Sequence, residues 1–577
     1  MPSISSTSQA GLTMPAVMRR SALMILTLAA VGSWWLSSRG LSGIQDYYFF
    51  HQDLPLLLVG GAAMFAAART PVAAGVAATE LKPRAVIALT IAAVALAYIG
   101  TWVVMNRYAM SRDEDMADFA ARYMQQGLLG MQIPTKFHGF GKAGLPSSAG
   151  RFIAHGYWVS DYLPMNSVFR AAAGLVGDRW LAGPILLLIG IAATWKAARL
   201  LWPSDQAAAL VAVVLAATST QLIVNAMTPY ATTAHFALNA VWIVCFLHGG
   251  RNGHAAAILC GLVAAGLHQL HFHLLFLSGF IIWMVLTHRK GLAILYAGAA
   301  IGYCVFWDIV WTQFILFPLF GGGPAPGSNL SKTLSDVIVE HLSRLNNLEP
   351  ITSVARFLAW QNILTLPLVL IGVRAAIQKS RRNIPVSFAF VISLGIGLML
   401  MPWQGFGYGY RYLHHLMPCI ILLAASGVVH LKASGVFLKR KLLTTSIIFA
   451  VCISAPFAMW RSHELLMPYA NAYQILQNSP ADVVIVDPLA GAYVQDIVRV
   501  RNSNRGPFLL DMSELSINQI DYICDNNRVM IFDRADAKLV GIQGDEGFDT
   551  PAMISIRRKR VHMLERGCAR PVPVTNI

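Results

Sequence analysis

The stretch RAVIALTIAAVALAYIGTWVVMNRYAMSRDEDMADF (84–119) sets a long apolar run directly before a cluster of acids. A run of about 20 apolar residues is enough for a helix to cross the hydrocarbon core of a bilayer. Ser111 and Glu114 then match the S-x-x-E pattern, in which the two side chains cap the start of a helix. Asp113 and Asp115 fall in the first turn, where the helix dipole favours negative charge. The stretch therefore predicts a transmembrane helix followed by a capped, acidic helix at the membrane surface.

The composition of the whole chain indicates that this span is one of many. The chain has 577 residues, of which 56% are hydrophobic and 12% are charged, whereas a soluble domain carries roughly 25% charged residues. A chain of this kind is an integral membrane protein with several spans. The formal net charge is +16. Because cytoplasmic loops of membrane proteins collect Lys and Arg, we attribute this charge to such loops and not to nucleic-acid binding.

Apolar windows of roughly 17 to 25 residues predict an α-helical polytopic membrane protein with about 13 transmembrane helices. Counted from a cytoplasmic N-terminus, every inside loop then carries Lys or Arg, which satisfies the positive-inside rule. The windows fall near 19–38, 53–69, 84–106, 180–202, 206–225, 229–248, 254–271, 272–288, 291–317, 355–374, 384–402, 412–431 and 442–460.

This orientation divides the chain into three parts. Two extra N-terminal transmembrane helices occupy 1–83, the main transmembrane core occupies 84–460, and a C-terminal unit occupies 461–577. The core carries a large outer loop at 107–179 and a second outer loop at 318–354. Both loops and the C-terminal unit are therefore expected on the same, outer side of the membrane.

The C-terminal unit has the pattern of a small folded α/β domain. ADVVIVD (481–487) and RVMIFD (528–533) have the pattern of buried strands bounded by turn residues, and MSELSINQIDYICDN (512–526) has helical spacing between them. Cys524 and Cys568 would share an oxidising compartment there and could form a disulfide, but the sequence leaves their separation open.

The acids after the first core span also suit catalysis. Capping explains them structurally, yet a carboxylate held at the outer membrane surface can also deprotonate an acceptor hydroxyl. The two interpretations are compatible, because a capped helix start is a rigid place to hold a base. Asp113 and Glu114 are therefore the candidate catalytic residues.

A second polar segment, GFGYGYRYLHH (405–415), lies at an outer boundary of the apolar windows. Its glycines let the backbone approach a ligand closely, and the guanidinium of Arg411 matches the oxygens of a phosphate. Arg411 and Tyr412 are therefore candidates for binding a donor phosphate or substrate. An arginine that reaches the membrane interface and tyrosines that anchor there are the structural alternatives.

Further polar side chains gather at other outer boundaries. His268, His271 and His273 could hold a lipid phosphate or sugar groups if a bend in the chain brought them together. Arg151 and His155, in the large outer loop, could contact the sugar or the acceptor. Interfacial hydrogen bonding and an interfacial helix are the respective structural alternatives.

The Asp-Glu pair just beyond a span, together with three later segments, resembles the GT-C superfamily of membrane glycosyltransferases. This superfamily includes the protein O-mannosyltransferase and aminoarabinose transferase families. The resemblance rests on the order and sidedness of the segments and covers about 85 to 460. The segments are YLPMNSVFRAAAGLVGDRWLAGPILLLIGIAATWKAARLLWP (162–203), AATSTQLIVNAMTPYATTAHFALNA (216–240) and GFGYGYRYLHHLMPCIILLAASG (405–427).

The resemblance implies an inverting transfer of a sugar from a polyprenyl-phosphate donor to an envelope glycan, lipid or protein acceptor. In the family pattern Asp113 stands where the base does, and Glu114 is a neighbour that orients the acceptor or a metal. The resemblance implies no certain cofactor but leaves room for a divalent metal. The segment NAMTPYATTAH (225–235) lacks the further carboxylate that aminoarabinose transferases keep there, and the cysteines show no metal-ligand spacing.

The expected location is a bacterial inner membrane, with catalysis on the periplasmic side and the lipid bilayer, donor and acceptor as partners. Two alternatives stand beside this prediction. One is a multi-span transporter or flippase of lipid-linked sugars, which would carry internal repeats and broken helices; no sequence repeat is evident. The other is an inactive assembly protein of an envelope polysaccharide system.

Overall fold

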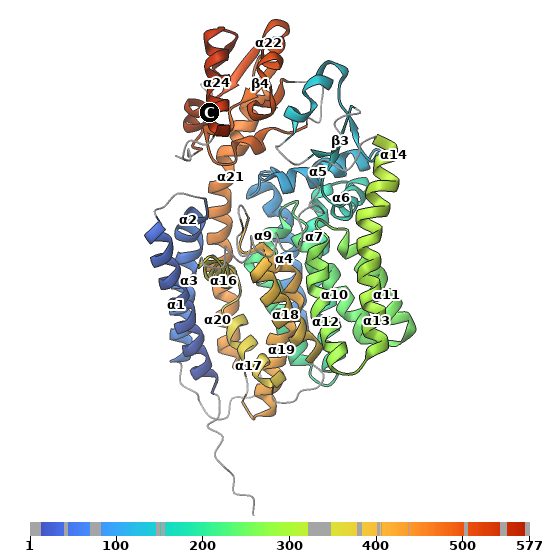
Figure 1. Cartoon of the computed structure of the whole chain (residues 1–577). Coiled ribbons are helices and arrows are strands. Elements are labelled where there is room, and N and C mark those ends of the chain that lie inside the picture. The colour runs from blue at the N-terminus through green and yellow to red at the C-terminus, as the bar shows by residue number, and fades with distance from the viewer. Residues whose placement is uncertain are drawn as a thin grey trace, which may run out of the picture.

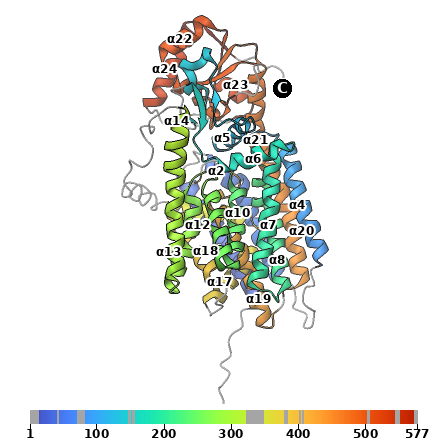
Figure 2. The same cartoon turned by 90° about the vertical axis from the view of Figure 1, so that its right-hand side faces the viewer.

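The computed structural model is a bundle of upright helices with a unit of helices and strands at one end (Figure 1). Figure 2, turned by 90°, shows the same arrangement from the side of the long helix that begins with α13. The structure describes residues 13–39, 44–69, 82–145, 150–151, 156–320, 348–377, 384–400, 404, 407–436, 438–500, 506–542 and 551–571.

The bundle is built from helices that the sequence predicts as spans. In chain order its helices are α1 (Met14–Arg39), α2 (Ile44–Tyr48), η1 (Phe49–Asp53), α3 (Leu54–Ala68), α4 (Pro83–Val103), α7 (Ala182–Leu201), α8 (Gln206–Ala217), α9 (Thr220–Ala226), α10 (Thr232–His248), α11 (Gly250–Ala265), α12 (His271–Leu286), α13 (Lys290–Cys304), η5 (Val305–Leu316), α14 (Phe317–Phe320), α16 (Glu349–Ala359), α17 (Thr365–Ile377), α18 (Ile384–Leu400), η7 (Arg411–Leu416), α19 (Met417–Ala433), α20 (Arg440–Phe449), η8 (Ala450–Ser454) and α21 (Ala455–Gln477).

An α-helical membrane architecture is confirmed. Among the described residues, 7 helices are long and apolar enough to cross a membrane, and α8 with α9 makes an eighth if the two are one span bent by 54°. Helices also lie over the other predicted windows, but they are shorter, so the count of about 13 spans stays a prediction. The 7 helices are Met14–Ser38, Asp46–Arg69, Pro83–Val103, Arg179–Leu201, Lys290–Phe320, Arg411–Ala433 and Arg440–Gln477.

A buried ion pair joins the N-terminal helices to the bundle. Asp53, at the end of η1, lies 3.3 Å from Nε of Arg356 on α16 and accepts a hydrogen bond of 2.8 Å from Nε1 of Trp360. The Nη2 atom of Arg356 donates a second bond of 2.6 Å to the carbonyl oxygen of Gly407. Through this guanidinium, the N-terminal helices support the polar segment that carries Arg411.

Small residues let two core helices approach closely. A Cβ atom on Gly372 of α17 would lie 2.0 Å from the carbonyl oxygen of Leu423, and one on Gly427 of α19 would lie 2.3 Å from that of Leu368. These two glycines therefore admit no side chain without separating the backbones, which is a common way for membrane helices to pack.

The large outer loop folds onto the end of the bundle. Its strands pair antiparallel in the order β1-β3-β2. The second outer loop of the prediction, 318–354, lies mostly in residues 321–347, outside the described residues. The elements of the large loop are α5 (Arg112–Met124), β1 (Met131–Gln132), η2 (Thr135–Gly144), β2 (Gly150–Arg151), β3 (Tyr157–Ser160), α6 (Met165–Leu175) and η4 (Arg179–Leu181).

The C-terminal unit contains a parallel four-stranded sheet in the order β5-β4-β6-β7. A disulfide joins Cys524 and Cys568, so the pairing that the sequence left open is made. The unit packs on the large loop, where the rings of Phe137 and Phe508 stack at 3.7 Å. Its elements are β4 (Val483–Val486), η9 (Pro488–Ala490), η10 (Val494–Ile497), β5 (Phe508–Asp511), η11 (Met512–Glu514), α22 (Ile517–Asn526), β6 (Val529–Phe532), α23 (Arg534–Leu539), α24 (Pro551–Glu565) and β7 (Ala569–Pro571).

One continuous helical pillar connects the bundle with the C-terminal unit. Arg440–Gln477, made of α20, η8 and α21, is 38 residues long and rises out of the bundle into that unit (Figure 1). His463 Nδ1 lies 2.9 Å from the carbonyl oxygen of Val104, and Arg461 donates a bond of 3.1 Å to the hydroxyl of Tyr47. The pillar is thus fastened both near the end of α4 and to the N-terminal helices where it leaves the bundle.

Candidate active site

The predicted capping box starts helix α5. The backbone N–H of Ser111 donates to Oε2 of Glu114 at 2.9 Å, and the Ser111 hydroxyl accepts from the Glu114 N–H at 3.4 Å. The Ser111 hydroxyl also lies 2.7 Å from that of Tyr230 on the chain before α10. Both the helix start and its link to the bundle therefore depend on polar side chains that the sequence pattern indicated.

The acids of α5 face different partners, and only one of the acid triplet lines a cavity. Glu114 is 1% exposed and turns toward the cap. Asp115 lies 3.8 Å from Arg499 of the C-terminal unit, and Asp118 pairs with Arg179. Asp113 is the acid of this helix that lines the cavity.

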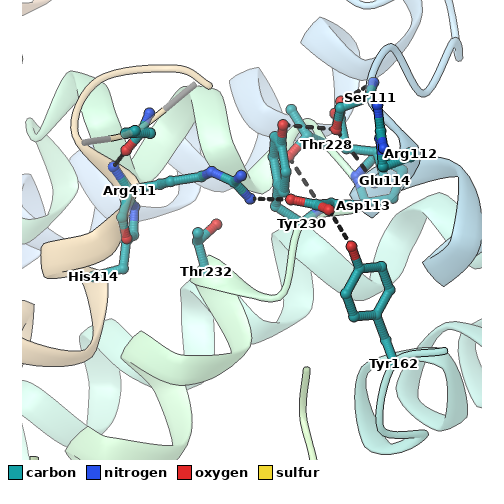
Figure 3. Close-up of polar contacts among 12 residues, drawn as sticks. Ser111, Arg112, Asp113, Glu114, Tyr162, Thr228, Tyr230, Thr232, Arg411 and His414 are labelled. Atoms are coloured by element: carbon teal, nitrogen blue, oxygen red, sulfur yellow. Dashed lines mark hydrogen bonds and ion pairs between the residues drawn. The ribbon is translucent and has the colours of Figure 1, made fainter. Parts of the chain in front are cut away.

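Asp113 is held between two side chains from distant segments. Its Oδ2 atom lies 2.7 Å from Nη1 of Arg411, and its Oδ1 atom accepts a short hydrogen bond from the hydroxyl of Tyr162. Figure 3 shows Arg411 and Tyr162 reaching Asp113 from two different directions. Asp113 and Arg411, two predicted site residues from distant parts of the sequence, are therefore in direct contact.

Arg411 is positioned by its own segment and by aromatic rings. Its backbone N–H donates 2.6 Å to Oε1 of Gln404, and its guanidinium lies 4.5 Å from the ring centre of Tyr230 and 5.4 Å from that of Tyr412. Gly409 has φ of +65°, a conformation that favours glycine. The Nε atom of Arg411 is buried and has no hydrogen-bond partner among the described residues.

A cavity of about 320 Å³ opens beside Asp113 and Arg411. One part of its wall comes from the bundle and the large loop, and another part comes from the C-terminal unit. The wall consists of Ser111, Arg112, Asp113, His268, Gln269, Phe272, Arg411, Tyr412, Tyr493 and Asp496.

The three predicted histidines are not brought together. His268 lines the cavity, and its ring lies 4.0 Å from that of Tyr162. His271 is exposed, and His273 is buried with Nδ1 2.9 Å from Oδ1 of Asn239. His268 precedes helix α12, whereas His271 and His273 lie in its first turn, and of the three only His268 lines the cavity.

The remaining predicted contacts have mixed outcomes. Tyr412 lines the cavity beside Arg411. Arg151 belongs to strand β2, but its side chain lies outside the described part of the chain, and so does the whole of His155.

Five residues of the cavity wall were missed from the sequence: Arg112, Gln269, Phe272, Tyr493 and Asp496. Arg112 precedes Asp113 and lies on the same helix start. Tyr493 and Asp496 come from the segment that begins between η9 and η10 of the C-terminal unit. No periodicity or motif marks GAYVQDIV (491–498), because its place at the cavity follows from how two folded parts dock.

The surroundings of the acids outside the spans change their proton affinities. Burial raises the pKa of Asp113, but Arg411, His268 and the Tyr162 hydroxyl outweigh this and lower it to about 2. Burial raises the pKa of Glu114 to about 7 against the opposing hydrogen bonds from Ser111. A carboxylate and a carboxyl that differ this much, side by side in the chain, have different roles.

The residues present do not fit a divalent metal. Both oxygens of Asp113 are taken by Arg411 and Tyr162, and a guanidinium at 2.7 Å would repel a cation. Within the described ranges no group of three or more His, Cys, Asp or Glu side chains is arranged to hold a metal ion. We therefore derive no step through a metal.

No family model and no curated protein sequence matches the chain. Among solved structures, ArnT from Cupriavidus metallidurans bound to undecaprenyl phosphate is similar with a TM-score of 0.49 and 12% identity, over 74% of this chain and 86% of that chain. The apo state of that ArnT gives a TM-score of 0.44 at 12% identity over the same shares. The archaeal oligosaccharyltransferase AglB from Archaeoglobus fulgidus, with an inhibitory peptide and a dolichol-phosphate, gives 0.39 at 12% identity over 74% of this chain and 64% of that chain.

At 12% identity these matches are likenesses of fold alone.

Proposed function

We propose that this protein is an inverting membrane glycosyltransferase. It moves a sugar from a polyprenyl-phosphate donor to an envelope glycan, lipid or protein acceptor on the periplasmic face of a bacterial inner membrane. The observation that supports this most is the contact of 2.7 Å between Asp113 and Arg411 in the cavity wall. It sets a carboxylate base and a phosphate-binding cation side by side in one cavity.

In this proposal the two side chains act on opposite ends of the transfer. Asp113 accepts the proton of the acceptor hydroxyl as its oxygen attacks the anomeric carbon of the donor sugar. The bond from that carbon to the phosphate oxygen breaks on the opposite face, which inverts the configuration. Arg411 stabilises the negative charge that develops on the leaving phosphate.

Arg411 has the donors that this requires. A guanidinium carries five N–H donors in a fork, and the link to Asp113 uses Nη1. Nε is without a partner among the described residues. Because Arg411 lines the cavity, a phosphate oxygen can approach guanidinium donors that the link to Asp113 does not use. The rings of Tyr230 and Tyr412 support the planar face of the guanidinium.

The test is the release of free polyprenyl phosphate by the purified protein. A panel of polyprenyl-phosphate sugars is offered together with an envelope glycan extract, and wild type is compared with Asp113→Asn. Asp178→Asn is a matched control, because Asp178 caps η4 in the same loop and does not line the cavity. We expect release by wild type and by the control, and none by Asp113→Asn. Folded wild type that releases nothing from any donor contradicts the proposal.

A flippase of lipid-linked sugars is the second candidate. One observation favours it: α8 and α9 meet at a bend of 54°, and the bend is lined by buried polar groups, with Ser219 donating 2.9 Å to Gln361. Broken helices with polar linings occur at transport sites. Movement of a labelled lipid-linked sugar across vesicles, with no release of polyprenyl phosphate, would favour this candidate over the transferase.

A further inference from the structure

The C-terminal unit contributes a carboxylate to the cavity. Asp496 lies in η10 and is 1% exposed. Its Oδ2 atom accepts a hydrogen bond of 3.1 Å from the backbone N–H of Arg112. Its Oδ1 atom lies 3.3 Å from Nε of Arg112 but accepts no hydrogen bond from any described residue. Arg112 balances the charge of this buried oxygen, but no described residue makes the hydrogen bond that such an oxygen ordinarily accepts.

Asp113 and Asp496 differ in how completely they are bonded. Tyr162 bonds one oxygen of Asp113 and Arg411 the other. Asp113 is thus well held for orienting a hydroxyl but strongly stabilised in its charged form. Asp496 has a less satisfied carboxylate in the same cavity, and its bond to Arg112 attaches it to the residue next to Asp113.

We infer that Asp496 is a second catalytic carboxylate, which touches the acceptor and takes up from Asp113 the proton that Asp113 has accepted from the acceptor hydroxyl. This inference rests on the proposed transferase function. In the step, the acceptor O–H bond breaks, the bond from oxygen to the anomeric carbon forms, and the bond from that carbon to the phosphate oxygen breaks. The electron pair leaves with the polyprenyl phosphate, and the proton comes to rest on Asp496 until solvent removes it.

The charged groups around Asp496 favour it over Asp113 as the final acceptor of the proton. Burial raises the pKa of Asp496 to about 6, although Arg112 and Arg499 oppose the rise and Asp113 adds to it. Two tyrosines face Asp496: Tyr469 from the pillar and Tyr108 from just beyond the end of α4. A group that holds a proton near pH 6 is a better final acceptor than Asp113, whose pKa is about 2.

The test is the pH dependence of polyprenyl phosphate release, measured from pH 5 to 8 with the donor panel and the envelope glycan extract. A base must be deprotonated to act, so the wild-type rate should fall as pH decreases through about 6 and lose about tenfold per pH unit below it. Asp496→Asn should be slower by about 10- to 100-fold at pH 7.5 and should show no such fall. Asp496→Glu should restore much of the rate and the fall.

The variants are chosen to separate chemistry from folding. In Asp496→Asn the new amide oxygen can still accept the hydrogen bond from the backbone N–H of Arg112, and only the ion pair with Nε of Arg112 is lost. Asp511→Asn is the matched control, because Asp511 is a buried acid of the same unit that bonds Ser513 and does not line the cavity. It should keep both the rate and the pH profile of wild type.

An infrared measurement makes the outcome independent of turnover. The carboxyl band of the full-length protein is followed from pH 5 to 8, and wild type is compared with Asp496→Asn. We expect one titrating carboxyl that is missing in the variant. An Asp496→Asn profile that still falls below pH 6, or no difference in the carboxyl band, would overturn the role of Asp496. Loss of release in wild type at every pH would instead overturn the transferase function and the catalytic role with it.

Discussion

Two aspartate–arginine pairs of this protein have the same chemistry and different surroundings. Asp53 and Arg356 meet at 3.3 Å deep among helices, and both side chains are 7% exposed or less. Asp113 and Arg411 meet at 2.7 Å in the wall of a cavity, with exposures of 16% and 12% respectively. The two pairs meet at the same segment: Arg411 belongs to it, and Arg356 donates a hydrogen bond to the carbonyl oxygen of Gly407, four residues before Arg411.

The two pairs have the same residue types, so their surroundings must distinguish a pair that supports the fold from a pair that can act in catalysis. The Arg356 and Trp360 side chains lie against the oxygens of Asp53, and neither Asp53 nor Arg356 lines the cavity. Asp113 and Arg411 both line it, so a ligand in the cavity can contact them. We therefore expect the first pair to control stability and the second to control turnover.

The largest effect on activity is expected from Asp113→Asn. The amide keeps the size of the side chain but cannot accept the acceptor proton, so release should fall by about 10²- to 10⁴-fold. The unfolding midpoint should fall less than in Asp53→Asn, because Arg411 lies at the wall of a cavity and the cap of α5 is made by Ser111 and Glu114. Equal loss of activity and of thermal stability would remove the distinction between the two pairs.

Arg411→Lys is expected to have the next largest effect. Lysine keeps the positive charge but loses the planar fork and its stacking on Tyr230. The rate of polyprenyl phosphate release should therefore fall about 10- to 100-fold. A lysine variant with wild-type kinetics would show that a point charge is sufficient and that the geometry of the fork is not used.

Asp53→Asn should reduce stability more than activity, unlike the two variants above. It leaves Arg356 buried without its counter-charge, which typically costs about 3–5 kcal/mol of stability. We expect a clear drop in the unfolding midpoint in detergent, measured by intrinsic fluorescence. The activity per folded molecule should fall less than in Arg411→Lys, because Arg356 still bonds the carbonyl oxygen of Gly407. A folded variant without activity would make this pair part of the chemistry.

Glu114→Gln should have the smallest effect on activity and a distinct effect on pH dependence. The pKa of Glu114 is raised from 4.5 to about 7, chiefly by burial, so the folded protein binds this proton more tightly than the unfolded chain. Stability from this group is therefore present at low pH and is lost as pH rises through about 7, by up to about 3 kcal/mol. Glutamine is neutral at every pH and still caps, so thermal unfolding at pH 5 and 8 should differ less in the variant than in wild type.

The sequence predicted those parts of the site that a short sequence pattern marks. The S-x-x-E pattern identified the start of α5, and the polar segment in an apolar chain identified Arg411. The contact between them could not be derived from either pattern, because it needs two helices and a loop to pack in one arrangement. The family resemblance supplied the expectation that both act on one substrate.

Other features depend on three-dimensional arrangement and were beyond the sequence. His268 precedes α12, whereas His271 and His273 lie in its first turn, and the apolar window of the sequence does not mark this boundary. Asp496 reaches the cavity only because the C-terminal unit docks on α5. The strands at 483–486 and 529–532 were predicted, but their neighbours at 508–511 and 569–571 were not, because short strands carry little periodic signal.

The pillar Arg440–Gln477 has a mechanical consequence. Its 38 residues amount to about 57 Å of helix at a rise of 1.5 Å per residue, whereas the hydrocarbon core of a bilayer is about 30 Å thick. The C-terminal unit is thus carried by a helix that is fastened near the end of α4 and to the N-terminal helices. A thicker or thinner bilayer would cover a different length of this helix without changing the distance between Asp496 and Asp113. We therefore expect turnover to tolerate changes in acyl chain length that alter the tilt of the other spans.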